Sequence, residues 1–135
     1  MQSYIFDFSR VDTFFDEWNK KFDVEDMNGS NNFEVVVSSY SPNNINECLN
    51  ADGTLNTSVV TGIYSQNLAL LWANNIIKVA FDVTFNFGNN IVPLKSAFIR
   101  DKVTGYVMGY SIFMNTFNVT NQLIIDAETI LWSIE

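Results

Sequence analysis

The chain contains no histidine and one cysteine, Cys48, among its 135 residues. Without histidine, serine and cysteine nucleophiles lose their usual general base, and ordinary zinc sites lose a common ligand. A lone cysteine forms no internal disulfide, which fits either a reducing compartment or a core that needs no covalent staple. The glycines form no phosphate-binding loop. These absences exclude several classes of catalytic and nucleotide-binding site.

A calcium loop is suggested only by residues 23–32, where acids surround a glycine. With Gly29 at the sixth loop position, the first and twelfth positions are Val24 and Val35. Both essential acidic ligands are therefore missing. We expect a solvated acidic turn in this segment, and we expect the chain to use no metal and no cofactor.

Basic residues are also scarce, because 7 Lys and Arg stand against 15 Asp and Glu, for a formal net charge of −8. Phosphates would repel such a chain, so we expect no nucleic-acid partner. Residues 1–52 hold 10 acids and 3 bases, whereas residues 53–135 hold 5 acids and 4 bases. The N-terminal acids form either a solvated surface or a face that meets a basic partner.

Two long stretches, residues 53–77 and 103–125, have no charged side chain. Neither predicts a membrane span, because both are rich in Asn, Thr, Ser, Gln and Gly, which are costly in lipid. Few charges are left to keep exposed sheet faces apart, and a sheet edge without such protection invites pairing with a neighbouring chain. The two stretches favour a role in assembly.

The strongest fold signal lies in residues 77–87, where a large apolar side chain recurs at every second position. Only a β-strand places such residues on one face. Burial of each side chain is worth roughly 1.5–3 kcal/mol. The pattern predicts one central strand with this apolar row: Ile77, Val79, Phe81, Val83, Phe85 and Phe87.

Asparagine- and glycine-rich segments separate further runs of β-branched and aromatic residues. We expect a hairpin turn at residues 74–75, the end of the central strand at 88–90, and a positive φ at Gly105 in a short hairpin loop. Pro93 cannot donate a ladder hydrogen bond and marks an edge, a bulge or a strand start. Further strands are predicted at residues 33–39, 59–64, 67–73, 91–100, 106–113, 118–125 and 129–134.

Repeated short strands with tight turns predict a mainly β fold. We expect a single domain over residues 1–135, built as an antiparallel β-sandwich with Greek-key or jelly-roll connections. Residues 41–56 are polar and predict a long loop, and long loops in compact domains are commonly contact sites.

One N-terminal segment has a helical period instead. Its apolar side chains fall on one stripe and predict an α-helix near residues 10–22. The stripe either packs on the protein's own sheet or docks into another subunit. Its members are Val11, Phe14, Phe15, Trp18 and Phe22, with Asp12, Asp16 and Glu17 among the helix's polar residues.

Paired carboxylates are the remaining route to catalysis, as in glycoside hydrolysis. Asp82, on the polar side of the central strand, is the best-placed acid, with Asp101, Asp126 or Glu128 as its partner. A single acid on a strand is ordinarily a solvent-facing residue, so we expect no enzyme. Exposed aromatics that stack on sugar rings would instead make a carbohydrate-binding module, and the candidates are Tyr64, Trp72, Tyr106 and Tyr110.

Three segments of the C-terminal third form a series: residues 97–113, which turn at Thr104-Gly105, then 117–120, and last 130–134. This series resembles the small β-sandwich structural proteins of tailed-phage virions, in which a Thr-Gly hairpin is followed by a Val-Thr strand and a terminal Ile-x-Trp strand. The resemblance implies a capsid decoration (auxiliary) protein, or another small head or tail component. It also implies a virion location after synthesis in the host cytoplasm.

The partners implied by this resemblance are capsid subunits. The charge-free stretches add self-association as a further expectation, and their polar residues lead us to expect no membrane partner. An acidic surface would meet a basic shell, through either the helix or the loop 41–56. The predicted partner-binding residues are Phe14, Phe15, Trp18, Asp12, Asp16, Glu17, Tyr106 and Tyr110.

Overall fold

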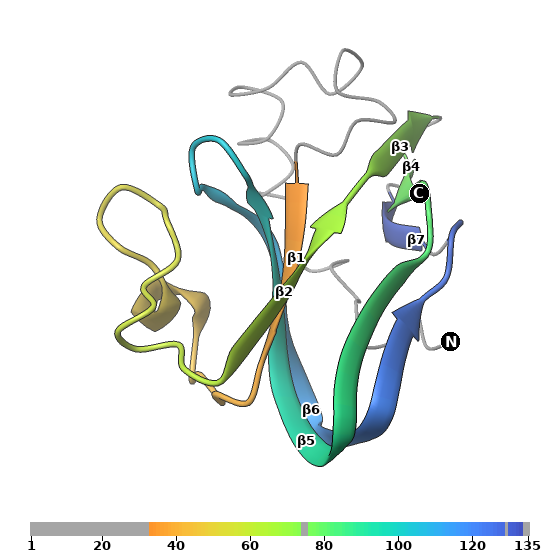
Figure 1. The fold of residues 1–135 in the computed structure, drawn as a ribbon. Helices are drawn as coiled ribbons and strands as arrows, with labels where there is room; N and C mark the ends of the chain where they lie inside the picture. The colour runs from red at the N-terminus through yellow and green to blue at the C-terminus, as the bar shows by residue number, and fades with distance from the viewer. Residues whose placement is uncertain (1–32, 74–75, 129, 134–135) are drawn as a thin grey trace.

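The computed structural model describes residues 33–73, 76–128 and 130–133, and they form a mainly β structure (Figure 1). Two antiparallel sheets are present, one in the order β2-β1-β5-β6 and one in the order β3-β4-β7. The predicted helix at 10–22 lies outside the described residues. The elements are β1 (Phe33–Ser38), the 3-10 helix η2 (Ile45–Cys48), β2 (Ile63–Leu68), β3 (Leu70–Ala73), β4 (Ile76–Val79), β5 (Val83–Asp101), β6 (Val107–Ile125) and β7 (Ile130–Ser133).

The chain crosses between the two sheets at both ends of the β3–β4 hairpin. β3 and β4 pair as a hairpin, and the Ala80 N–H donates to the Ala69 carbonyl at 2.9 Å just beyond that pairing. Past this bond the two strands diverge, because β2 pairs with β1 while β5 pairs with β6. The chain therefore passes from one sheet to the other at Ala69, and again between β4 and β5.

The prediction of a single strand over residues 77–87 is wrong at its centre. β4 ends at Val79, β5 begins at Val83, and Phe81 is 63% exposed. Val83, Phe85 and Phe87 are buried as the alternation indicates. The break occurs because β4 and β5 serve different sheets, so the backbone must leave one ladder before it joins the other.

The β5–β6 hairpin is long and sharply bent (Figure 1). Its register shifts between Asn86 and Gly88 and again between Gly88 and Ile91. Gly88 and the opposing Asn121 both have positive φ, at 64° and 67°. Glycine and asparagine adopt this conformation at low cost, and bulges increase local bending. The predicted strand end at 88–90 is therefore wrong, since the strand continues through a bend.

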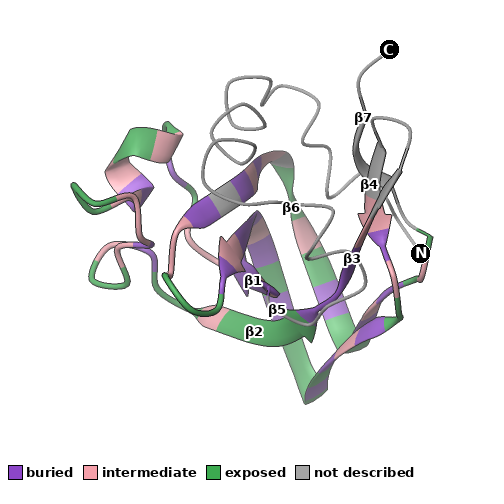
Figure 2. Ribbon diagram, turned by 90° about the horizontal axis from the view of Figure 1, so that it is seen from above, coloured by how far each residue is buried: buried purple, intermediate pink, exposed green. Residues whose placement is uncertain are grey.

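The main core lies inside the folded hairpin. Phe85 and Phe87 from the first half of β5 belong to the same buried cluster as Leu94 and Ile99 from its second half. β1 contributes Phe33, Val35 and Val37 to this cluster, while Val36 faces a second cluster with Phe98. β1 is therefore covered on both faces (Figure 2).

Several other predictions are confirmed. A strand runs from Phe33 to Ser38, and the hairpin turn after β5 has a positive φ of 79° at Gly105. β3 and β4 pair in the register of a two-residue hairpin, although residues 74–75 themselves lie outside the described part. Pro93 lies in a part of β5 that pairs with β6 alone, because β1 pairs with β5 only from Ser96 onward.

Candidate interaction surface

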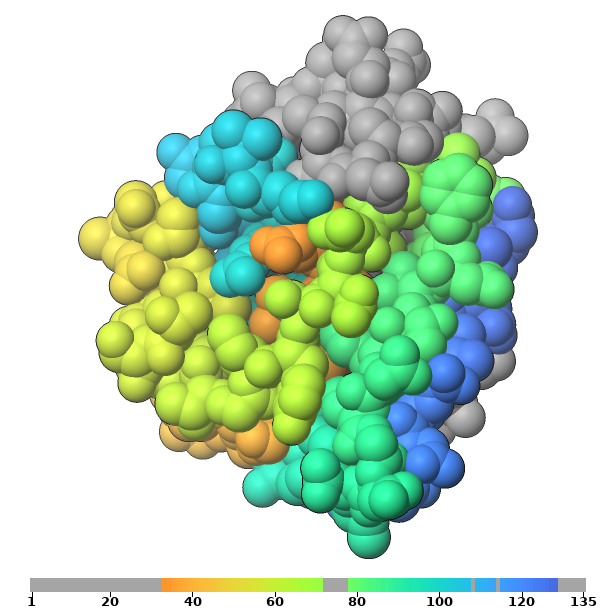
Figure 3. Space-filling view, in the orientation of Figure 1, coloured from red at the N-terminus to blue at the C-terminus, as the bar shows by residue number. Residues whose placement is uncertain are grey.

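β2 forms one edge of the four-stranded sheet, with β1 on its inner side. Four consecutive side chains, from Tyr64 to Asn67, are exposed. Consecutive residues of a strand point to opposite faces, so this run exposes β2 on both faces as well as along its edge. Figure 3 shows the atoms of this strand uncovered on the near face of the molecule. We call residues 63–68, with their outward backbone groups, the β2 edge.

Two hydrogen bonds establish which backbone groups of β2 point outward. The Ser39 N–H donates to the Gly62 carbonyl at 3.3 Å, so the backbone groups of Gly62 point toward β1. Along an antiparallel pair of strands, hydrogen-bonded and non-hydrogen-bonded residue pairs alternate. The backbone N–H and C=O groups of residues 64, 66 and 68 therefore also point toward β1. The Ala69 carbonyl points the other way, toward Ala80. Positions 63, 65 and 67 thus direct their N–H and C=O groups to the open side.

These outward groups have no hydrogen-bond partner among the described residues. A row of unpaired groups on an edge strand is a template for another strand. Proteins usually protect such edges with lysine, proline, a bulge or a very short strand. β2 has none of these features, because its pairing with β1 runs over six positions without a register shift and its side chains are uncharged.

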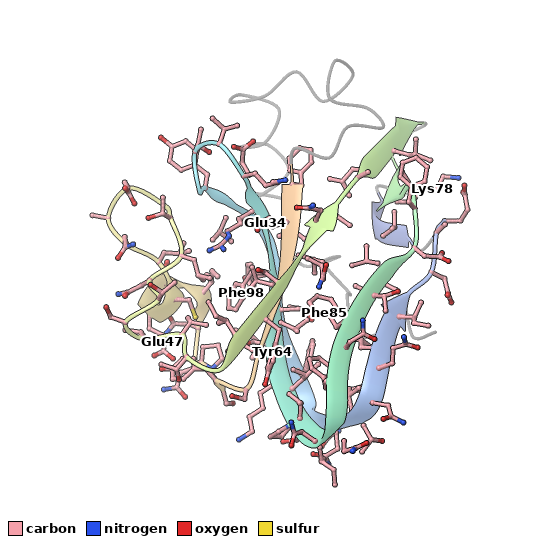
Figure 4. All side chains as sticks on the ribbon, in the orientation of Figure 1. Glu34, Glu47, Tyr64, Lys78, Phe85 and Phe98 are labelled. Carbon is pink, nitrogen blue, oxygen red and sulfur yellow. The ribbon has the colours of Figure 1, made fainter. Side chains whose placement is uncertain are left out.

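The two ends of the β2 edge are fixed by side-chain contacts, and Figure 4 labels Tyr64 at one of them. The Tyr64 and Phe87 rings meet in a T-shaped arrangement, with centroids 4.8 Å apart, and Tyr64 is 42% exposed. Near the other end, Lys102 Nζ donates to Asn67 Oδ1 at 2.9 Å. These contacts hold the strand at both ends, and the first of them places Phe87 of β5 against β2.

The loop between β1 and β2 is ordered by its own polar side chains. Glu47 accepts hydrogen bonds from Tyr40 Oη at 3.1 Å and from the Asn43 N–H at 2.7 Å. Asp52 Oδ1 accepts from the Thr54 N–H at 3.1 Å and from Thr54 Oγ1 at 2.6 Å. The predicted loop at 41–56 therefore carries a short helix, η2, and tight turns, which present a fixed surface.

Tyr40, Cys48 and Asp52, between β1 and β2, have shifted pKa values. Burial, reinforced by the nearby Glu47 carboxylate, raises the pKa of the Cys48 thiol to about 11. Desolvation and the bond to Glu47 raise the pKa of Tyr40, while the Thr54 hydrogen bonds lower the pKa of Asp52. Cys48 is thus a buried thiol at neutral pH, and a thiol is a poor nucleophile and metal ligand.

Six predicted partner-binding residues lie outside the described part of the chain: Phe14, Phe15, Trp18, Asp12, Asp16 and Glu17. The other two, Tyr106 and Tyr110, are half-buried and pack against the main core. Tyr110 also contacts the second cluster. These tyrosines therefore have a packing role, and with Tyr64 they form no row of fully exposed rings. The Trp72 side chain is not described.

Asp82, Asp101 and Glu128, three acids considered for catalysis, make structural bonds. Asp82 Oδ1 accepts from the Ala127 N–H at 2.7 Å, and Glu128 pairs with Lys78 at 2.6 Å. Asp101 is buried and accepts from the N–H groups of Val103 and Thr104, at 2.8 and 2.7 Å. Asp82 thus joins the turn after β6 to the link between β4 and β5, and Glu128 joins the same turn to β4.

Within the described ranges, no three His, Cys, Asp or Glu side chains are grouped so that they could hold a metal ion. The described part of the chain also has no helix with the length and apolar character needed to cross a bilayer. No family model, curated protein or solved structure matches this chain.

The sequence indicated the charge-free stretch but not the β2 edge. It predicted strands at 59–64 and 67–73, which leaves Ser65 and Gln66 between them. The structure instead turns at Val59 and Val60, whose N–H groups both donate to the Asn56 carbonyl, and places one strand over Ile63–Leu68. Pairing with β1 overrides the modest strand propensity of Ser, Gln and Asn.

Proposed function

We propose that this protein is a non-enzymatic structural protein that works by packing against neighbouring subunits of an assembly. The observation that carries the proposal is the β2 edge, a regular and charge-free strand whose outward backbone groups have no partner among the described residues. Main-chain pairing at such an edge supplies affinity without a pocket. This surface suits a protein that is held in place rather than one that turns over a substrate.

The assembly we propose is the shell of a tailed-phage virion, with the chain as a capsid decoration protein. The support is the resemblance of residues 97–113, 117–120 and 130–134 to such proteins, together with the mainly β fold. A tail or head–tail component is the alternative within the same class. A decoration protein binds assembled shells and stabilises them, because it buries surface across the joints between capsid subunits.

We further propose that the two sheets stack as the layers of an antiparallel β-sandwich with Greek-key or jelly-roll connections. The strand exchange at Ala69 supports this arrangement, because the chain crosses from one sheet to the other at that residue. The shared core supports it as well, since it contains Leu70 and Val79 of the smaller sheet beside Phe85 of the larger one. Helical packing of residues 10–22 on this body is part of the same proposal.

The shell contact we propose is the acidic N-terminal part of the chain. Residues 1–52 carry 10 acids and 3 bases. A surface of one sign docks on a surface of the opposite sign, and such docking weakens as salt rises. The loop at 41–56 belongs to the same part and gives it a fixed, exposed region that contains Glu47 and Asp52.

The test uses assembled shells purified from the virus whose genome encodes this chain. The wild-type chain is expected to co-sediment with the shells and to raise their melting temperature. The triple variant Asp12→Asn/Asp16→Asn/Glu17→Gln, which removes three negative charges, is expected to bind less. The change of the exposed Asn115, Thr116 and Asn118 to Lys, which raises the net charge by the same amount, is expected to bind normally. Absence of co-sedimentation and of any melting shift would contradict the shell proposal.

A glycan-binding screen tests the alternative of a carbohydrate-binding module. Among the side chains that the structure describes, the exposed aromatic ones are Tyr64 and Phe81, on β2 and on the link between β4 and β5. Sugar-binding platforms need several aromatic rings beside polar groups. We expect no binding, and saturable binding that Tyr64→Ala abolishes would replace the assembly proposal.

A further inference from the structure

We propose that the β2 edge pairs with the β2 edge of a second copy of this chain, antiparallel, across a two-fold axis at Ser65. The proposal rests on the assembly role above and names the neighbour at this edge. Two copies paired in this way would join their four-stranded sheets into one continuous sheet.

The direction of the backbone groups sets the register. A two-fold axis perpendicular to a sheet keeps each face of the sheet on the same side, so paired residues must be of equal parity along β2. Positions 63, 65 and 67 carry the outward groups. The register that uses all of them pairs Ser65 with Ser65 of the second copy, and Ile63 with its Asn67. Each such pair exchanges two hydrogen bonds.

The side chains agree with this register. Tyr64 and Gln66 share one face of β2, because their partners on β1, Val37 and Val35, both point into the main core. In the dimer, Tyr64 would lie opposite Gln66 of the second copy, where an aromatic ring and a neutral amide are compatible. No like charges face each other on the strand itself, since β2 has none.

Electrostatics favour this edge over the rest of the surface for self-association. Each copy carries a formal charge of −8, so two copies repel each other in most orientations. β2 lies within residues 53–77, which contain no charge. Beside it, Glu34 and Arg100 neutralise each other at 3.0 Å, and the ammonium group of Lys102, bound to Asn67, adds a positive charge to an otherwise acidic molecule.

The other edges are less suited to the same pairing. β3 and β7 flank the smaller sheet and have four residues each. β6 is long, but its pairing with β5 contains four register shifts and a sharp bend. A bent and bulged edge presents its backbone groups in several directions, which opposes pairing with a straight strand.

Sedimentation velocity on the purified full chain, across a wide concentration range, tests the dimer. An interface of one strand edge is small, so we expect a reversible dimer that forms as concentration rises. Ser65→Lys places two ammonium groups at the axis and is expected to weaken the dimer at least tenfold. Thr57→Lys adds the same charge at an exposed turn in the same charge-free stretch and is expected to leave the dimer unchanged.

Disulfide crosslinking tests the register and does not depend on the charge variant. Only a residue on the axis meets its own copy, at a Cα separation of about 5.5 Å, which suits a disulfide. Ser65→Cys is expected to form a covalent dimer under mild oxidation, at least tenfold faster than Asn67→Cys. Cys48 is buried and gives little background. Circular dichroism checks that each variant is folded.

Three results would overturn this proposal: a monomer at every concentration, a dimer that Ser65→Lys leaves intact, or equal crosslinking at positions 65 and 67. Shell binding is read separately. A monomeric chain that still stabilises shells would remove the dimer and keep the proposed function. A dimer that ignores shells would keep the β2 pairing and remove the decoration role.

Discussion

The two edges of the four-stranded sheet differ although both come from charge-free stretches. β2, within residues 53–77, is straight, regular in its pairing and exposed at four consecutive positions. β6, within residues 103–125, is bent and bulged, and its Phe113 and Phe117 pack against the main core. Absence of charge is therefore not enough to define an interaction edge. Regular pairing and exposed backbone groups are needed as well.

The difference follows from what each edge does for the fold. β6 pairs with β5 along most of its length, and the bend brings both halves of the hairpin around one core. β2 contributes mainly Leu68 to that core, and its other side chains are exposed or half-buried at the edge of the sheet. We infer that the hairpin supplies most of the stability, whereas β2 is available for contact with other molecules.

The largest expected effect is in the hairpin. Phe85 is fully buried and stacks near Phe87, with ring centroids 6.1 Å apart. Phe85→Ala is expected to lower the free energy of unfolding by about 3–5 kcal/mol. Phe81→Ala, in the same apolar row of the sequence but exposed, is expected to change it by less than about 0.5 kcal/mol. Urea unfolding measures both, and equal losses would contradict the break between β4 and β5.

Adjacent positions of β2 give the next comparison. Gln66→Pro removes an N–H that faces β1 and leaves a buried Val35 carbonyl unpaired, at a cost of about 2–3 kcal/mol. Ser65→Pro removes an outward N–H and is expected to cost about 1 kcal/mol, mainly through the fixed φ of proline. Thermal unfolding followed by circular dichroism compares them. A greater loss for Ser65→Pro would reverse the assignment of the open side.

The turn of the β5–β6 hairpin is expected to show a smaller effect. Asp101 is buried and accepts two backbone N–H bonds and one from Thr104 Oγ1. Asp101→Ala leaves these donors with poorer partners and is expected to cost about 2 kcal/mol. Asp52→Ala is the control, because Asp52 makes similar bonds to Thr54 at an exposed site, where water replaces them. Its expected cost is below about 1 kcal/mol.

The smallest expected effect is the alkaline response of the loop that leads to β2. The Cys48 pKa is raised from 9.0 to about 11, so between these values the thiol ionises in the unfolded chain and not in the folded one. The contribution of the neutral Cys48 thiol to the free energy of unfolding is therefore complete below pH 9 and is lost as the pH rises toward 11. The raised pKa of Tyr40 acts in the same direction.

Denaturant unfolding at pH 8, 9, 10 and 11 measures this loss. Cys48→Ala is expected to show a smaller decline over the same range, although its stability at pH 8 is lower because of the cavity. An identical decline in both proteins would show that the thiol does not contribute.

Local sequence signals predicted many strands but not how they are shared between sheets. The alternation in residues 77–87 gave the buried faces of Val83, Phe85 and Phe87 correctly. It could not show the break at residues 80–82, because that break depends on distant pairing partners. Likewise, the Gly88-Asn89-Asn90 segment has the composition of a turn, yet β6 pairs across it and converts it into a bend.

The candidate surface was predicted only in part. Lack of charge in residues 53–77 indicated an assembly surface, but Ser65 and Gln66 gave no strand signal. Their strand conformation comes from pairing with β1, where Val36 lies opposite Ser65 and Val35 lies opposite Gln66. The expected aromatic contacts, Tyr106 and Tyr110, are packed on the core, because side chains in the second half of the hairpin lie over its interior.

Residue-resolved amide hydrogen exchange on β2 tests the central claim most directly. At low concentration, the amides of Ile63, Ser65 and Asn67 are expected to exchange quickly, while those of Tyr64, Gln66 and Leu68 are protected by β1. At high concentration, or on an assembled particle, the first three are expected to become protected. Uniform protection at low concentration, or fast exchange at Ser65 under every condition, would contradict an open edge that pairs with a neighbour.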